Sequence, residues 1–163
     1  MGKIKILFVC HGNICRSPMA ESVMTYMVKK RGMEKSFEIA SAATSREEIG
    51  NPPHCGTVNK LRQEKITVVP HCAIQMTKQD YEKYDYLIGM DAANLRNMNR
   101  IAGGDPKGKL YKLLTFAGEG GDVADPWYTG DFDATYRDVC RGLEGFLEYL
   151  QHPDQEPSNF EPL

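Results

Sequence analysis

The chain carries the stretch Cys10-His11-Gly12-Asn13-Ile14-Cys15-Arg16 between two segments of different periodicity. The segment before it, Ile4–Val9, is a mostly apolar run typical of a strand that is buried on both faces of a parallel sheet. Residues 17–30 follow with apolar side chains at helical spacing, and Pro18 suits a first helical turn. The stretch is therefore predicted to be a loop that joins a strand to a helix.

A cysteine and an arginine with five residues between them can close a tight anion-binding loop. Backbone N–H groups turn inward, the helix N-terminus adds positive partial charge, and the guanidinium offers a planar fork to two oxygens. The same positive field stabilises a thiolate, so Cys10 is the expected nucleophile. The residues expected to bind phosphate are His11, Gly12, Asn13, Ile14, Cys15 and Arg16.

Strand-like and helix-like segments alternate along the rest of the chain. This alternation predicts an α/β fold, with a four-stranded parallel sheet flanked by helices on both faces and the phosphate-binding loop after the first strand. Such a sheet is flavodoxin-like or Rossmann-like, and ligands bind it at the carboxyl ends of the strands. The other expected elements are strands at residues 37–42, 86–90 and 110–114, and helices at residues 17–30, 54–64, 92–100 and 132–150, with a short helix capped by Thr77 and Asp80.

Length and composition narrow the class of protein. Residues 1–152 are expected to form one domain, and residues 153–163, with three prolines and three acids, a mobile tail. Twenty basic and 22 acidic residues give a net charge of −2, which argues against nucleic acid as a partner. The apolar run Ile4–Val9 is too short to enter a membrane. Five cysteines without metal-ligand spacing predict a cytoplasmic protein that needs no metal or cofactor.

A long loop, residues 118–128, follows the fourth expected strand and contains Asp125 next to Pro126. In phosphoryl transfer, a carboxylic acid placed at the oxygen that leaves phosphorus lowers the barrier when the leaving group is poor. Asp125 is therefore the candidate general acid. Asp122 is the alternative carboxylate in the same loop. An isolated Asp-Pro more often starts a turn, but the cysteine loop upstream favours the chemical interpretation.

The string Val9-Cys10-His11-Gly12-Asn13-Ile14-Cys15-Arg16-Ser17-Pro18-Met19-Ala20-Glu21, with Asp125-Pro126 downstream, resembles the low-molecular-weight protein tyrosine phosphatase family. The resemblance extends over about residues 3–150. It implies hydrolysis of phosphotyrosine in proteins through a phosphocysteine on Cys10, with Arg16 binding the phosphoryl group and Asp125 acting as general acid and base. Tyrosine-phosphorylated proteins would be the partners, and the chain would be a monomer or weak dimer.

Four further residues are expected to support the loop. Asn13 can adopt a left-handed backbone, and the resemblance implies a hydrogen-bond network with Ser41 and His71. Ser17 could donate a hydrogen bond to the thiolate or cap the helix. Asp91 could brace the guanidinium or cap the next helix.

Cys15 has two interpretations. The resemblance suggests a reversible disulfide with Cys10 that protects the nucleophile from overoxidation, and the alternative is a small buried apolar residue. The three other cysteines are expected to be packing residues, namely Cys55, Cys72 and Cys140.

The expected substrate cleft departs from the family at two places. His11 stands where many relatives have an apolar residue, and Glu47 where several have an aromatic one. Trp127 and Tyr128 can supply apolar walls instead, while Glu47 would repel acidic peptides. Ile14 favours phosphotyrosine, because similar arginine phosphatases look to carry a threonine there.

Two other functions compete with this one. A thiol-dependent arsenate reductase shares the fold and the loop, but relatives of that kind carry a closely spaced cysteine pair after the third strand, and this chain has no cysteine between Cys72 and Cys140. A phosphate-binding adaptor without activity would not need Cys10, Arg16 and Asp125 together.

Overall fold

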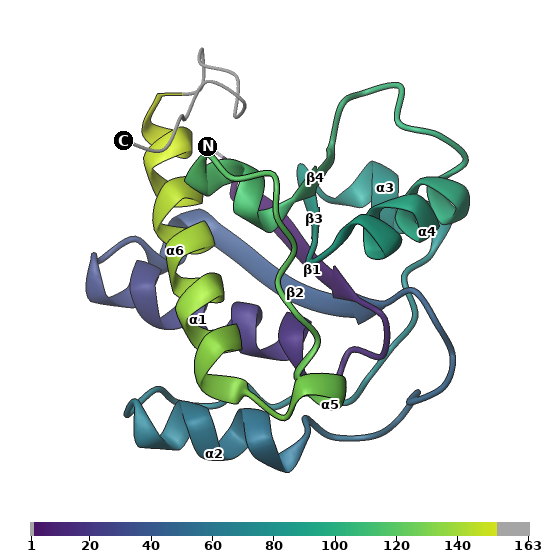
Figure 1. Ribbon diagram of the computed structural model, residues 1–163. Coiled ribbons are helices and arrows are strands. Elements are labelled where there is room, and N and C mark those ends of the chain that lie inside the picture. Colours follow the sequence, from purple (N-terminus) through teal and green to yellow (C-terminus); the bar gives the residue numbers. More distant parts are fainter. Residues whose placement is uncertain (1, 153–163) are drawn as a thin grey trace.

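The computed structural model describes residues 2–152, with a parallel four-stranded sheet at its centre (Figure 1). The strands lie in the order β2-β1-β3-β4, so the predicted α/β fold is confirmed. The tail predicted at residues 153–163 lies outside the described residues. The strands are β1 (Ile4–Cys10), β2 (Phe37–Ala43), β3 (Tyr86–Gly89) and β4 (Leu110–Lys112).

Helices cover both faces of the sheet (Figure 1). Side chains of β1 alternate between the two layers: Ile6 and Phe8 pack with α1 and α6, while Leu7 and Val9 pack with α3 and α4. All four are fully buried or nearly so, which explains the unbroken apolar run from Ile6 to Val9. The helices are α1 (Arg16–Lys30), α2 (Cys55–Gln63), α3 (Lys78–Lys83), α4 (Ala92–Ala102), α5 (Pro126–Thr129) and α6 (Phe132–Gln151), with 3-10 helices η1 (Glu34–Ser36) and η2 (Leu113–Ala117).

The fourth strand is shorter than predicted. Leu113 and Leu114 belong to η2 rather than to β4, and both are buried against the core on the side of α6. Helix α6 lies directly on η2 because Gly145 has no side chain: a Cβ there would stand 2.1 Å from the carbonyl oxygen of Phe116. A short apolar run fits either a strand or a buried turn, and this tertiary contact selects the turn.

Capping groups fix the ends of several helices. The predicted capping box is confirmed at α3, where Thr77 and Asp80 each accept the other's backbone N–H. No helix among residues 2–152 is long and apolar enough to cross a membrane.

Candidate active site

The loop between β1 and α1 lies at the carboxyl edge of the sheet. It is next to the topological switch point between the neighbouring strands β1 and β3. Cys10 is the last residue of β1 and is 2% exposed. Cys10 Sγ lies 3.1 Å from Ser17 Oγ, and the backbone N–H of Asn13 donates to the sulfur at 3.3 Å. Two hydrogen-bond donors can thus be directed at the sulfur.

Asn13 holds the loop in shape. Its φ of 59° is the left-handed conformation expected from the sequence. Its side-chain nitrogen donates to Ser17 Oγ at 2.8 Å and to Ser41 Oγ at 3.0 Å, and its oxygen lies 2.6 Å from His71 Nε2. The structure therefore brings Asn13, Ser41 and His71 together as the resemblance implied. Ser17 is the second residue of α1, which begins at Arg16, so the alternative role as a helix cap is wrong.

The same network ends on the buried carboxyl group of Glu21, the last residue of the string that carries the family resemblance. Glu21 is the sixth residue of α1, and its Oε1 accepts a hydrogen bond from Ser41 Oγ at 2.6 Å. Burial raises the pKa of Glu21, although the bond from Ser41 opposes this, and burial lowers the pKa of His71. The sequence does contain a signal for the burial of Glu21, because Glu21, Met24 and Val28 recur at helical spacing on one apolar face.

The guanidinium of Arg16 is held through two of its three nitrogens. Its Nη1 donates to Asp91 Oδ2 at 2.6 Å and to the Val123 carbonyl at 3.0 Å, while Nη2 lies 3.4 Å from Asp125 Oδ2. Burial opposes the charge, but the negative charges of Cys10, Asp91 and Asp125 raise the pKa of the guanidinium. Nε is buried and has no partner among residues 2–152, so it remains available to an anion.

Both interpretations of Asp91 hold at once, since its two oxygens have different partners. Oδ2 accepts from Arg16, and Oδ1 accepts from the Asn94 backbone at 2.7 Å and caps α4. Asp125 is similar, because its Oδ1 caps α5 through the Trp127 N–H at 3.1 Å while Oδ2 faces Arg16. Asp125 therefore both caps α5 and faces the pocket.

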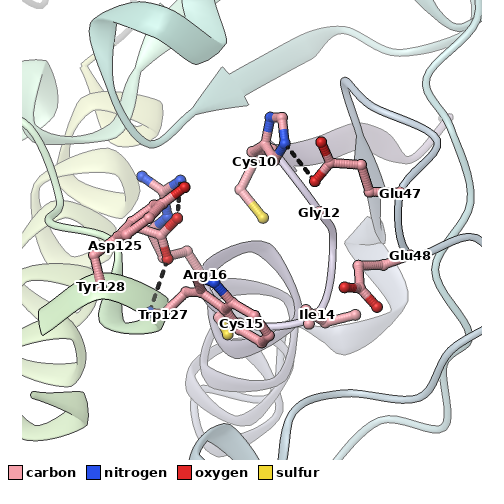
Figure 2. A pocket seen from close by; sticks show the side chains of 11 residues that line it. Cys10, Gly12, Ile14, Cys15, Arg16, Glu47, Glu48, Asp125, Trp127 and Tyr128 are labelled. Atoms are coloured by element: carbon pink, nitrogen blue, oxygen red, sulfur yellow. Dashed lines mark hydrogen bonds and ion pairs between the residues drawn. The ribbon is translucent and has the colours of Figure 1, made fainter. Parts of the chain in front are cut away.

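A pocket opens above the cysteine, and the side chains predicted for the cleft line it. Figure 2 shows Glu47 and Glu48 on one side, Asp125 and Tyr128 on the other, and the Cys10 sulfur between them. Trp127 and Tyr128 are 57% and 83% exposed, so their rings form an open wall rather than a core. The lining residues are Cys10, His11, Gly12, Ile14, Cys15, Arg16, Glu47, Glu48, Asp125, Trp127 and Tyr128.

The acidic side of the pocket was only partly predicted. His11 Nε2 lies 3.0 Å from Glu47 Oε2, so the two residues that depart from the family contact each other. Glu48 was missed, and its side chain packs beside Gly12 and accepts a hydrogen bond from Asn51 at 2.6 Å. Asp122, the alternative acid, does not line this pocket, because its carboxylate contacts Lys112 and the Ala92 backbone.

The cysteines differ in their surroundings. Cys15 is buried beside Ile14 and Ala73, and burial, aided by the charge of Cys10, raises the pKa of its thiol to about 12. Cys140 is half-buried against the main core, as expected of a packing residue. That expectation is wrong for Cys55 and Cys72, which are exposed. Cys55 starts α2 and Cys72 lies in an irregular segment, where no neighbouring layer covers them.

A parallel sheet with a cysteine and an arginine in the loop after its first strand, and a carboxyl group across the pocket from them, is the arrangement expected of a phosphatase. Residues 5–156 match the family model of low molecular weight phosphotyrosine protein phosphatases. The chain therefore belongs to the low molecular weight protein tyrosine phosphatase family and is a protein tyrosine phosphatase.

Relatives from bacteria and animals support this assignment. Low molecular weight protein-tyrosine-phosphatase YfkJ of Bacillus subtilis is 39% identical over 93% of this chain and 99% of its own. Its crystal structure superimposes with a TM-score of 0.90 over 95% and 99% of the two chains. The mouse low molecular weight phosphotyrosine protein phosphatase is 38% identical over 91% and 96%. A drosophila arginine phosphatase structure is also similar, with 27% identity and a TM-score of 0.81 over 94% and 99%.

Proposed function

We propose that the chain hydrolyses phosphotyrosine in proteins by two displacements at phosphorus, with Cys10 as nucleophile. In the first, the Cys10 sulfur bonds to phosphorus, the bond to the tyrosine oxygen breaks, and that oxygen takes a proton from Asp125. In the second, the Asp125 carboxylate takes a proton from water, water oxygen bonds to phosphorus, and the phosphorus–sulfur bond breaks. Inorganic phosphate leaves and the thiolate is restored.

The observation that carries this proposal is the convergence of three side chains on one pocket, Cys10, Arg16 and Asp125. Arg16 would bind two phosphoryl oxygens with Nε and Nη2, the nitrogens that its partners Asp91 and Val123 leave free. Backbone N–H groups of the loop would hold the remaining charge. No step calls for a metal or a cofactor.

Phosphotyrosine is the substrate that fits the pocket walls best. An aromatic ring against the wall formed by Trp127 and Tyr128 would bury apolar surface, and Ile14 adds an apolar side chain at the pocket. Phosphoarginine is the second candidate because of the similarity to an arginine phosphatase. A charged guanidinium would gain from Glu47 and Glu48 but would bury less apolar surface against the two rings.

We further propose that Cys15 protects Cys10 by forming a disulfide with it under oxidation. A role of this kind suits a reducing compartment, where the bond can be reversed, and all five cysteines are free in the structure. We therefore place the protein in the cytoplasm. We also propose that it is a monomer or weak dimer, as the family resemblance implies.

The mechanism is tested with a series of aryl phosphates. Asp125→Asn should lower kcat/KM about 10²- to 10⁴-fold when the phenol has a pKa near that of tyrosine, and much less when the phenol is strongly acidic, because only a poor leaving group needs the proton. Cys10→Ser should abolish turnover yet still bind phosphate. Equal slowing by Asp125→Asn across the series would show that this carboxyl group is not the acid.

Substrate class is tested separately with peptides of one sequence that carry phosphotyrosine, phosphoserine or phosphoarginine. We expect phosphotyrosine to be hydrolysed fastest. A higher kcat/KM on phosphoarginine would transfer the assignment to that substrate while leaving the cysteine chemistry intact.

A further inference from the structure

The segment that presents Asp125, residues 118–125, has two adjacent glycines and no regular structure of its own after η2. Among residues 2–152, no atom outside their immediate neighbours stands within 4 Å of the place that a Cβ would occupy on Gly120 or Gly121. Glycines in such open surroundings leave the backbone many conformations. Something must hold this segment if Asp125 is to stand at a fixed place over the cysteine.

The side chain of Lys112 bridges the glycine pair. Its Nζ donates to the Gly120 carbonyl at 2.7 Å and to Asp122 Oδ1 at 2.9 Å, one partner on each side of Gly121. The same Asp122 oxygen accepts the N–H of Ala92, the first residue of α4, at 3.1 Å. The segment is thus tied to the strand that ends at Lys112 and to the start of a helix.

Lys112 is well placed for this task because it stands on a rigid element. It is the last residue of β4, in register with Gly89 of β3, and its side chain is 16% exposed. A partly buried ammonium with two oxygen partners loses less to solvent than an exposed ion pair does.

The restraint continues from Asp122 toward the pocket. Val123 is fully buried, its N–H donates to the Met90 carbonyl at 2.9 Å, and its own carbonyl accepts from Arg16 at 3.0 Å. Asp125 follows two residues later. Lys112 itself is absent from the residues that line the pocket, so any influence on the reaction passes through the segment.

The ionic contact between the segment and α6 cannot replace this one. Glu119 pairs with Arg141 on α6, but it precedes both glycines, so it fixes only the start of the segment. Beyond the glycines, Arg16 contacts the Val123 carbonyl and Asp125 from within the site, whereas Lys112 holds the glycine pair itself.

We propose that Lys112 is a positioning residue for the phosphatase reaction, which holds the Gly120–Val123 backbone so that Asp125 stands at the leaving oxygen. The inference rests on the proposed role of Asp125 as general acid. A small displacement of a catalytic group costs up to about 10²-fold in rate. In kcat/KM, which reports the first displacement, the loss falls on substrates whose leaving oxygen needs the proton of Asp125.

The test uses Lys112→Met, which keeps the length of the side chain and removes the charge, and Lys112→Arg, which keeps two donors. Lys112→Met should lower kcat/KM about 10-fold for an aryl phosphate with a tyrosine-like phenol and less than about 2-fold for one with a strongly acidic phenol. Lys112→Arg should restore most of the loss. Inhibition by inorganic phosphate should stay unchanged, because Lys112 does not reach the loop.

Lys107→Met is the matched control, since Lys107 pairs with Glu82 on the surface before β4, and it should behave as the parent does. On an Asp125→Asn background, Lys112→Met should cause no further loss. Equal slowing of all substrates by Lys112→Met, or no slowing, would overturn the inference. If Asp125→Asn shows leaving-group dependence and Lys112→Met does not, the positioning role alone fails; if neither shows it, the acid assignment fails as well.

Discussion

Asp91 Oδ2 lies 2.6 Å from Nη1 of Arg16, while the other oxygen of the same carboxylate caps α4. The guanidinium is 2% exposed, so this contact replaces much of the water that a cation would otherwise bind. It also fixes the orientation of the fork, because Nη1 has two partners, Nη2 lies beside Asp125 and Nε has no partner among residues 2–152. The helix and the anion site thus depend on one side chain.

The first prediction separates these two duties of Asp91. Asp91→Asn keeps an oxygen that can cap α4 but removes the negative charge from Arg16. We expect the inhibition constant of inorganic phosphate to rise and kcat/KM to fall about 10-fold, the effect of losing about 1.5 kcal/mol of a charge-assisted hydrogen bond. Asp91→Ala should also lower the free energy of unfolding by about 1 kcal/mol through the lost cap. An Asn variant with unchanged phosphate inhibition would show that Arg16 needs no brace.

The second prediction concerns the hydroxyl group beside the sulfur. Ser17→Ala removes the group 3.1 Å from Cys10 Sγ, so a charged sulfur there would lose one hydrogen-bond partner. We expect alkylation of Cys10 by iodoacetate to slow across its pH profile and kcat/KM at neutral pH to fall about 10-fold.

Ser22→Ala is the control for this variant, because Ser22 is a buried serine of the same helix that accepts the Val69 N–H at 3.0 Å and does not line the pocket. It should leave the alkylation profile unchanged. Identical profiles for the parent and Ser17→Ala would mean that the backbone N–H of Asn13 suffices.

Sequence reasoning succeeded where the signal was local. The change from an apolar run to helical spacing around Cys10 and Arg16 located β1, the loop and α1 to within a residue or so. The left-handed Asn13 and the Thr77 capping box also depend on neighbours in the chain. Asp125 could be placed near the cysteine because the carboxyl ends of parallel strands meet at one edge.

What was missed depends on contacts between distant segments. The end of β4 is set by α6, whose Gly145 admits the Phe116 carbonyl, and no periodicity near Leu113 reveals it. Glu48 lies in a loop whose direction the sequence does not encode locally. The link from Lys112 to Asp122 joins residues ten apart across a glycine pair, which composition alone marks only as a flexible loop.

The third prediction concerns charge selection at the pocket mouth. Glu47 is 69% exposed and faces the cleft beside His11, so wild type should hydrolyse a phosphotyrosine peptide with flanking lysines faster than one with flanking glutamates. Glu47→Gln should reduce this ratio about 2- to 5-fold, the range of an exposed ion pair, and added salt should do the same. Glu82→Gln, at a carboxylate outside the pocket, is the control. A ratio that does not respond to Glu47→Gln would place the selection elsewhere.

The last prediction concerns the reaction of the loop with peroxide. The Cys10 thiolate would attack one oxygen of hydrogen peroxide and release hydroxide, which leaves a sulfenic acid on Cys10. The Cys15 thiolate would then attack that sulfur and expel hydroxide, which leaves a disulfide. The second step requires Cys15 to ionise. Burial is the main cause that raises the pKa of its thiol to about 12, and the smaller contribution from the charge of Cys10 ends once Cys10 is a sulfenic acid. The thiolate fraction of Cys15 therefore rises with pH throughout the range below that value.

The rate of disulfide formation should accordingly rise about tenfold per pH unit between pH 7 and 9. The reason is that the thiolate fraction grows tenfold per pH unit while the pH is far below the pKa of the thiol. Rapid quenching with a thiol reagent, followed by mass spectrometry of the peptide that contains Cys10 and Cys15, measures the rate directly. Cys15→Ser should lose the bridge and become irreversibly oxidised, whereas Cys72→Ser, at an exposed cysteine outside the pocket, should close as fast as the parent. A rate that does not change with pH would mean that Cys15 is not the attacking thiol, and an inactivated parent without the bridge would rule out protection by Cys15 altogether.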